Sequence, residues 1–142
     1  MPEILLAEDN AADVYLIREA LREHNIECNV RLLTDGKEVL AFIADQNSSR
    51  SAQANPDLII LDLNLPRHDG IEILQRLRDD PKLARVPVVV LTSSDSPRDR
   101  QLANQLGAAR FLRKPSNLEQ FLALGSVFKE LLNESGCQAK GV

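Results

Sequence analysis

The sequence predicts an α/β fold, a doubly wound sandwich in which five parallel strands alternate with five helices. Short apolar runs alternate with amphipathic segments along most of the chain, as expected of repeated strand–helix units. One run, DLIIL at residues 57–61, is apolar almost throughout, which is typical of a central parallel strand covered on both faces. At 142 residues the chain is long enough for one domain and too short for a second. We therefore expect one domain over residues 1–133 and a flexible tail over residues 134–142.

Local sequence signals define the first two strand–helix units. A strand over residues 3–8 precedes Asn10, whose side chain is of the type that caps helix N-termini. A helix should therefore begin near Ala11, and apolar residues recur along it at helical spacing. Residues 29–34 are predicted as the second strand, and Asp35-Gly36 as the turn into the second helix.

The third unit follows a polar connection. The stretch from Asp45 to Asn55 is rich in Asn, Ser, Gln and Ala, which suits an exposed and mobile loop. The strand DLIIL comes next, and Pro66 and Gly70 then mark a loop before the third helix. Asp79-Asp80-Pro81 should end that helix, because proline cannot continue it.

The fourth unit combines a buried strand with clear helix signals. Residues 86–91 are predicted as the strand, and Ser96 followed by Pro97 as the cap and first position of the helix. Gly107 is expected just after the end of this helix, and residues 108–112 form the fifth strand.

The last helix is expected from a cap at Ser116 or Asn117 to near Leu132. Its apolar residues occupy more than one face of the helix. One face can pack on the sheet, and another must be shielded from water by a different partner. Two interpretations follow. Either the core is thick and a few leucines are exposed, or the second face forms a subunit interface.

The charge and the cysteine content narrow the class of protein. The chain has 17 basic and 21 acidic residues and a net charge of -4, which disfavours binding to nucleic acid or to an anionic membrane. It has no apolar stretch long enough to span a bilayer and no basic n-region of a signal peptide, so we expect a cytoplasmic protein. Cys28 and Cys137 lack the spacing of a metal site and should be free thiols. His24 and His68 stand alone, and catalysis by either is not expected.

Residues suited to phosphate chemistry stand at the ends of four predicted strands. They are Glu8-Asp9, Asp62, Thr92 and Lys114. The carboxyl ends of parallel strands meet at one edge of a sheet, so these side chains should share one pocket. Any one of them alone would more often be a helix cap or a solvated loop residue. The complete set is what predicts a site.

Such a pocket needs positive charge. Neighbouring carboxylates repel one another by roughly 4 kcal/mol per pair at an effective dielectric constant of about 20. Lys114 supplies one positive charge, and Mg²⁺, which prefers oxygen ligands, supplies two more. Glu8, Asp9, Asp62 and the backbone carbonyl of Asn64 are the predicted metal ligands.

Phosphoryl transfer is the predicted chemistry of the pocket. Asp62 ends the most apolar strand and is the expected nucleophile, which would form an aspartyl phosphate. Thr92 and Lys114 would hold the phosphoryl oxygens. Pro115 makes a cis bond after Lys114 conceivable, although most such bonds are trans.

Four segments of the chain resemble the receiver domains of two-component response regulators: AED near the start, LIILDLNLPRHDG, VVVLTSS and GAARFLRKP. The resemblance implies a flavodoxin-like fold with strand order 2-1-3-4-5. It also implies that Asp62 is the phosphoacceptor, that Glu8 and Asp9 are the acidic pair, and that Thr92, Lys114 and Phe111 are the switch residues.

The segments AEDNAADVYLIREAL, DLNLPR and LTSS, with the polar insertion before Asn55-Pro56, are similar to stand-alone regulators paired with phytochrome-type histidine kinases. This resemblance implies a histidine kinase partner and a signalling protein with slow self-dephosphorylation instead of a conventional enzyme. Phe111 stands where many members have Tyr, which implies a steric switch, and Ser93 stands where Ala or Gly is frequent, which implies slower turnover. With no output domain expected after residue 133, the signal should leave by protein contact, with homodimerisation through the last two helices and the fifth strand expected.

Two other functions stay open at this point. A Mg²⁺-dependent phosphohydrolase of the haloacid dehalogenase type also uses an aspartate at a strand end, but it needs a second Asp where this chain has Asn64. A receiver-like binding module that is never phosphorylated is the other alternative. Turnover of a phosphomonoester would indicate the first, and no labelling by a cognate kinase would indicate the second.

Overall fold

The computed structural model describes residues 1–46 and 55–140. The strands are β1 (Glu3–Ala7), β2 (Asn29–Leu33), β3 (Leu58–Leu61), β4 (Val88–Thr92) and β5 (Arg110–Arg113). The helices are α1 (Ala11–Glu23), α2 (Gly36–Gln46), α3 (Gly70–Asp79), α4 (Pro97–Gln105), α5 (Leu118–Ala123) and α6 (Gly125–Lys140).

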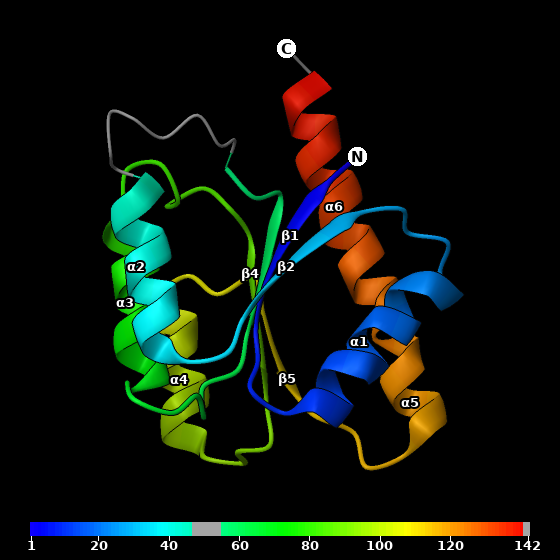
Figure 1. The fold of residues 1–142 in the computed structure, drawn as a ribbon, viewed down its shortest axis with the longest axis horizontal. Coiled ribbons are helices and arrows are strands. Elements are labelled where there is room, and N and C mark those ends of the chain that lie inside the picture. The colour runs from blue at the N-terminus through cyan, green and yellow to red at the C-terminus, as the bar shows by residue number, and fades with distance from the viewer. Residues whose placement is uncertain (47–54, 141–142) are drawn as a thin grey trace.

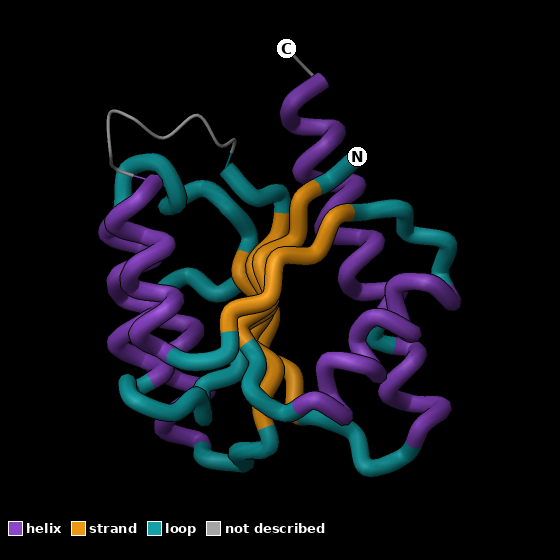
Figure 2. The backbone as a smooth tube through the Cα atoms, viewed as in Figure 1, coloured by secondary structure: helices purple, strands orange, loops and turns teal. Residues whose placement is uncertain are grey.

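The five strands form one parallel sheet between two layers of helices. The strand order is β2-β1-β3-β4-β5. Helices α2, α3 and α4 cover one face of the sheet, and α1, α5 and α6 cover the other (Figure 1). Figure 2 shows the strands stacked as one central layer between the two helical layers. The predicted fold class and the strand order implied by the resemblance are confirmed.

Each face of the sheet has its own hydrophobic core, because successive side chains of a strand point to opposite faces. Leu5 and Ala7 of β1 pack under α2, α3 and α4, whereas Ile4 and Leu6 pack against the other three helices. All of β3 and β4 is buried, as expected of central strands. Burying one such Ile or Leu stabilises the fold by about 1.5–3 kcal/mol. The sheet is therefore a rigid support for the loops at its edge.

Three predicted helix ends are confirmed by their cap geometry. Asn10 Oδ1 accepts hydrogen bonds from the Ala12 and Asp13 backbone N–H groups at 2.9 and 3.1 Å, and α1 begins at Ala11. Ser96 caps α4, and Pro97 takes its first position. Gly107 follows α4 with a φ of 80°, which is in the left-handed region that glycine adopts without strain.

The loop between β3 and α3 packs closely on itself because of Gly70. A Cβ atom at this position would lie 2.4 Å from both the Cα atom and the carbonyl oxygen of Leu63. Only glycine therefore allows α3 to begin directly over the segment that follows Asp62. Asp69 caps the helix, and its Oδ1 accepts a hydrogen bond from the Ile71 N–H at 3.0 Å. These contacts fix the backbone immediately after the predicted nucleophile.

The last helix differs from the prediction in two ways. It is broken into α5 and α6 at Leu124, so the described chain has six helices, and the expected end near Leu132 is wrong because α6 continues to Lys140. The break lies where the chain approaches α1: a Cβ atom on Gly125 would lie 2.4 Å from the carbonyl oxygen of Ala20 and 2.3 Å from the His24 ring. No proline follows to stop α6, and an established helix adds residues at little cost.

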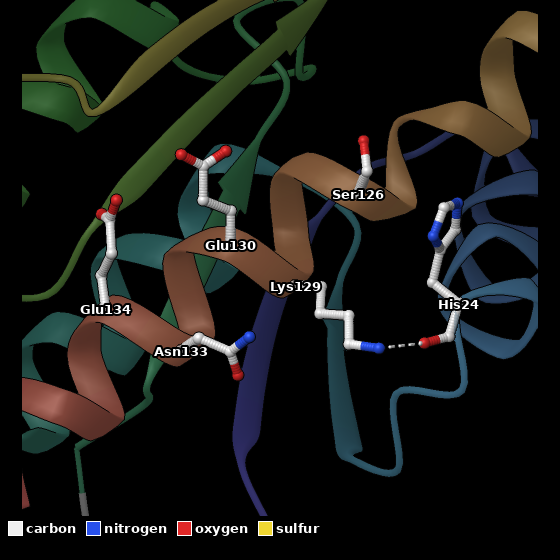
Figure 3. A pocket seen from close by; sticks show the side chains of 6 residues that line it. All are labelled: His24, Ser126, Lys129, Glu130, Asn133 and Glu134. Atoms are coloured by element: carbon white, nitrogen blue, oxygen red, sulfur yellow. Dashed lines mark hydrogen bonds between the residues drawn. The ribbon is translucent and has the colours of Figure 1, made fainter.

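His24 joins α1 to the break between α5 and α6. Its Nε2 lies 3.2 Å from the carbonyl oxygen of Leu122, and its own carbonyl oxygen accepts a hydrogen bond from Lys129 Nζ at 3.3 Å. Figure 3 shows the hydrogen bond from Lys129 to the His24 carbonyl oxygen. Both residues line a surface depression of about 490 Å³. These contacts give His24 a structural role.

Most apolar residues of α5 and α6 belong to the core. Phe121, Phe128 and Leu131 are buried, whereas Leu118 is 61% exposed. The thick core with an exposed leucine therefore explains most of the apolar residues on these helices.

Strand ends differ from the predictions by one or two residues. Strands β1 and β2 end one residue early, β4 covers Val88–Thr92 instead of residues 86–91, and β5 covers Arg110–Arg113 instead of residues 108–112. Of the predicted exposed connection, residues 47–54 lie outside the described residues.

The structure also bears on the predictions about the cysteines, the bond before Pro115 and membrane-spanning helices. Cys28 is a free thiol, and the side chain of Cys137 lies outside the described part. Within residues 1–46 and 55–140 every peptide bond is trans, including the bond between Lys114 and Pro115. None of the helices in the same ranges is both long and apolar enough to cross a membrane.

Candidate functional site

The sheet register brings the four chemically active strand ends together. Ala7 of β1 lies beside Leu61 of β3, so Glu8 and Asp62 follow neighbouring strands. Thr92 ends β4, and its carbonyl oxygen accepts a hydrogen bond from the Lys114 N–H at 2.7 Å. The carboxyl ends of the strands point down in Figure 1, where the loops into the helices begin. The predicted site residues thus meet at one edge of the sheet.

Three carboxylates form the acidic part of the site. One oxygen each of Glu8, Asp9 and Asp62 lies within 4.8 Å of the others. Glu8 and Asp62 are 1% and 5% exposed, whereas Asp9 is exposed at the rim. Two of the three carboxyl groups are therefore removed from water. In that low-dielectric environment two neighbouring negative charges would repel each other strongly.

Lys114 supplies the positive charge. Its Nζ donates hydrogen bonds to Glu8 Oε1, to Asp13 Oδ2 at 2.8 Å and to Asp62 Oδ2 at 3.0 Å. The Lys114 side chain is only 9% exposed. An ammonium has three protons, so each is used by one carboxylate.

Asn64 and Thr92 complete the polar surroundings of Asp62. The Asn64 N–H donates to Asp62 Oδ1 at 2.9 Å, and its side-chain amide donates to Thr92 Oγ1 at 3.0 Å. Thr92 Oγ1 also accepts from the Ser94 N–H at 3.1 Å. Since no described group accepts the Thr92 hydroxyl proton, the hydroxyl is available as a donor to a further group.

The buried charges shift one another's protonation. Burial and the neighbouring Asp62 carboxyl raise the pKa of Glu8 to about 9, although the Lys114 ammonium opposes this. Burial also acts to raise the pKa of Asp62, but the neighbouring Glu8 carboxyl, the hydrogen bond from the Asn64 N–H and the Lys114 ammonium outweigh it and hold that pKa below its ordinary value. Burial acts to lower the pKa of Lys114, but its bonds to Asp13, Glu8 and Asp62 raise it well above the ordinary value. Lys114 is therefore charged, and Asp62 is the ionised member of the buried carboxyl pair.

The arrangement fits a hard divalent cation. Glu8 Oε2 is buried and has no hydrogen-bond partner among the residues that the structure describes, which leaves an oxygen lone pair unsatisfied. The neighbouring donors are carboxylate oxygens, the ligands that Mg²⁺ and Mn²⁺ prefer. The role of the Asn64 carbonyl as a further ligand stays a prediction.

The sequence matches the response regulator receiver domain over residues 4–124. The chain belongs to the response regulator receiver family. Proteins of this family act in signalling, and so does this chain.

This receiver domain is similar to regulators of known structure. The response regulator Rcp1 of Synechocystis is 38% identical over 121 residues, which cover 85% of this chain and 82% of Rcp1. The phosphorylated cyanobacterial phytochrome response regulator RcpA superposes with a TM-score of 0.82 at 37% identity, over 92% of this chain and 93% of RcpA. The Mn²⁺-bound form of Rcp1 superposes with a TM-score of 0.81 at 35% identity, over the same shares of the two chains.

Two contacts of the receiver site were not anticipated from the sequence. Asp13 was assigned no role in the site from the sequence, and Asn64 was included only through its backbone carbonyl. The structure adds the Asp13 carboxylate to the partners of Lys114 and the Asn64 amide to those of Thr92. The one signal for Asp13 was its position at the N-terminus of a helix that starts at the same sheet edge.

Proposed function

We propose that this receiver domain accepts a phosphoryl group from a histidine kinase on Asp62, with Mg²⁺ held by Glu8, Asp9, Asp62 and the Asn64 carbonyl. The observation that carries the proposal is the contact of Asp62 with Lys114 inside a buried carboxylate cluster that has an unsatisfied oxygen on Glu8. Bound Mg²⁺ would supply positive charge beside the transferring oxygens.

The residues of the chain have separate roles in the transfer. An ionised Asp62 oxygen attacks phosphorus, the phosphorus–nitrogen bond to the kinase histidine breaks, and the electron pair of that bond returns to the imidazole. The Lys114 ammonium, which contacts Asp62, and the buried Thr92 hydroxyl would donate to phosphoryl oxygens. The cycle ends when water attacks phosphorus and Asp62 leaves as a carboxylate. The protein thus changes state once per phosphoryl group, unlike a conventional enzyme.

The two alternative functions have less support. A phosphohydrolase of the haloacid dehalogenase type would need an acid where this chain has Asn64, whose amide is occupied by Thr92. A module that ignores phosphate would not need the buried set of Glu8, Asp62, Thr92 and Lys114.

Intact-mass measurement tests the proposed function. The wild-type protein is incubated with Mg²⁺ and a phosphorylated phytochrome-type histidine kinase, and in parallel with acetyl phosphate. We expect the mass of one phosphoryl group to be added by the kinase, and a slower reaction with acetyl phosphate because Ser93 is larger than the Ala or Gly that is frequent at this position in receiver domains. No labelling by any such kinase would favour the unphosphorylated module, and steady turnover of an external phosphomonoester would favour the hydrolase.

The similarity to RcpA, a phytochrome response regulator, supports a phytochrome-type kinase as the partner. The net charge of -4 supports a protein partner over nucleic acid. We also infer that the protein works in the cytoplasm, as the sequence predicts.

The proposed switch runs through Thr92 and Phe111. Phe111 lies in β5, half-buried, with the Arg100 guanidinium carbon 5.1 Å from the centre of its ring. A phosphoryl group adds close to two negative charges and draws the Thr92 hydroxyl toward it, which leaves room for Phe111 to turn inward. Arg100 favours the present position of the ring, because a cation over an aromatic face is attracted to it. Phosphorylation must overcome that contact.

We expect the surface of α4, β5 and α5 to change and to form a homodimer. Beside Phe111, the surface of α4 has a depression of about 450 Å³, lined by Asp95, Pro97, Arg100, Gln101, Asn104 and Gln105.

Gel filtration with and without beryllofluoride, a phosphoryl mimic, should show more dimer in its presence. The Phe111→Ala variant should bind beryllofluoride and lose most of this change, because the side chain that transmits it is missing. A monomer under both conditions would rule out the dimer, and normal coupling in Phe111→Ala would rule out this route.

A further inference from the structure

Asp13 is the partner of Lys114 that stands outside the carboxylate cluster. Its Oδ2 atom lies 2.8 Å from Lys114 Nζ, and its side chain is 21% exposed at the mouth of the site. The cluster that could hold a cation consists of Glu8, Asp9 and Asp62 and does not include Asp13. Asp13 thus contacts the ammonium without belonging to the predicted metal ligands.

The three protons of Lys114 are all used in this structure, by Glu8, Asp13 and Asp62. A loaded site needs some of them for phosphoryl oxygens. Glu8 and Asp62 would then share their oxygens between the cation and Lys114, so their hold on the ammonium weakens. The contact with Asp13 is not subject to that competition.

Asp13 is also held firmly in place. It lies in the first turn of α1, and its N–H donates to the capping Asn10 side chain at 3.1 Å. The partial positive charge of a helix N-terminus favours a carboxylate there. Lys114 therefore meets an acceptor that is fixed on a helix.

We propose that Asp13 is a positioning residue for Lys114, which keeps one N–H of the ammonium bound and so leaves the other two directed at the phosphoryl oxygens. The inference rests on the proposed function and deepens it. The hydrogen bond, and not the charge, is what matters in this role, since a further negative charge beside a phosphoryl group is by itself unfavourable.

Two variants separate the hydrogen bond from the charge. Asp13→Ala removes the acceptor, whereas Asp13→Asn keeps an acceptor oxygen of nearly the same shape. Glu72→Ala is the matched control, because Glu72 is an exposed acid in the first turn of α3. It shares the favourable helix position of Asp13 and has no contact with Lys114.

The experiment measures beryllofluoride affinity at saturating Mg²⁺ by two-dimensional NMR titration. We expect Asp13→Ala to bind about three- to tenfold more weakly than the wild type, the effect of one charge-assisted hydrogen bond at a partly exposed site. Asp13→Asn should lie within about twofold of the wild type, and Glu72→Ala should match it, since both retain the acceptor for Lys114. The ¹⁵N signal of the Lys114 ammonium, visible when its protons are held, should weaken only in Asp13→Ala.

Three results would overturn the inference: wild-type affinity in Asp13→Ala, equal loss in Asp13→Ala and Asp13→Asn, or the same loss in Glu72→Ala. A wild-type protein that binds no beryllofluoride at all would instead overturn the proposed function, and this inference with it.

Discussion

Asp62→Asn is expected to abolish phosphorylation by a histidine kinase while the fold is retained. The asparagine has the shape of the aspartate, and its oxygen can still accept from Lys114 or from the Asn64 N–H. Its amide is not a nucleophile toward phosphorus, so no phosphoryl group can be transferred to this position. Lys114 also keeps its hydrogen bonds to Glu8 and Asp13 in this variant, which should preserve the folded state.

Intact mass after incubation with the kinase and Mg²⁺ measures this directly. Asp69→Asn is the control, because Asp69 caps α3 nearby and asparagine caps helices equally well. The control should be labelled like the wild type. If Asp62→Asn still gains the mass of a phosphoryl group, another carboxylate is the acceptor and the roles proposed for the site are wrong.

Magnesium affinity is expected to increase steeply with pH. Burial and the contact with Asp62 raise the pKa of Glu8 to about 9, so at neutral pH the Glu8 carboxyl carries a proton that the cation must displace. Below pH 9 each unit of acidification favours the proton over the cation. The apparent affinity should rise by up to about tenfold per pH unit between pH 6 and 8 and level off above pH 9.

Titration calorimetry in buffers of different ionisation enthalpy checks both the affinity and the number of protons released, which we expect to approach one per cation. Glu8→Gln has no proton to release, so it should bind Mg²⁺ more weakly and with a flatter pH dependence. An affinity that is constant from pH 6 to 8 in the wild type would show that Glu8 is already ionised before the cation binds.

These two results bear on the same site in different ways. The Asp62 variant tests which carboxylate reacts, and the pH dependence tests how the carboxylates are neutralised before they react. The lowered pKa of Asp62 and the raised pKa of Glu8 divide the buried pair into an ionised and a protonated member. That division leaves the ionised carboxylate on the residue that is proposed to attack phosphorus.

The sequence by itself determined the elements of the fold and most of the site. Caps such as Asn10 and Ser96 act on the residues next to them, and the apolar runs of β3 and β4 are buried whichever helices cover them. Once the strands are parallel, the residues after them must meet at one edge, which is why Glu8, Asp62 and Lys114 could be placed together.

Tertiary structure decided the features that depend on distant segments. The break at Gly125 comes from the close approach to α1, and the contact of Asp13 with Lys114 joins residues 101 positions apart. The raised pKa of Glu8 depends on how completely the neighbouring strands exclude water from its carboxyl. Periodicity and capping depend on neighbours along the chain, so they can be read from the sequence. The space at Gly125, the third partner of Lys114 and the burial of Glu8 depend on segments that meet only in the folded protein.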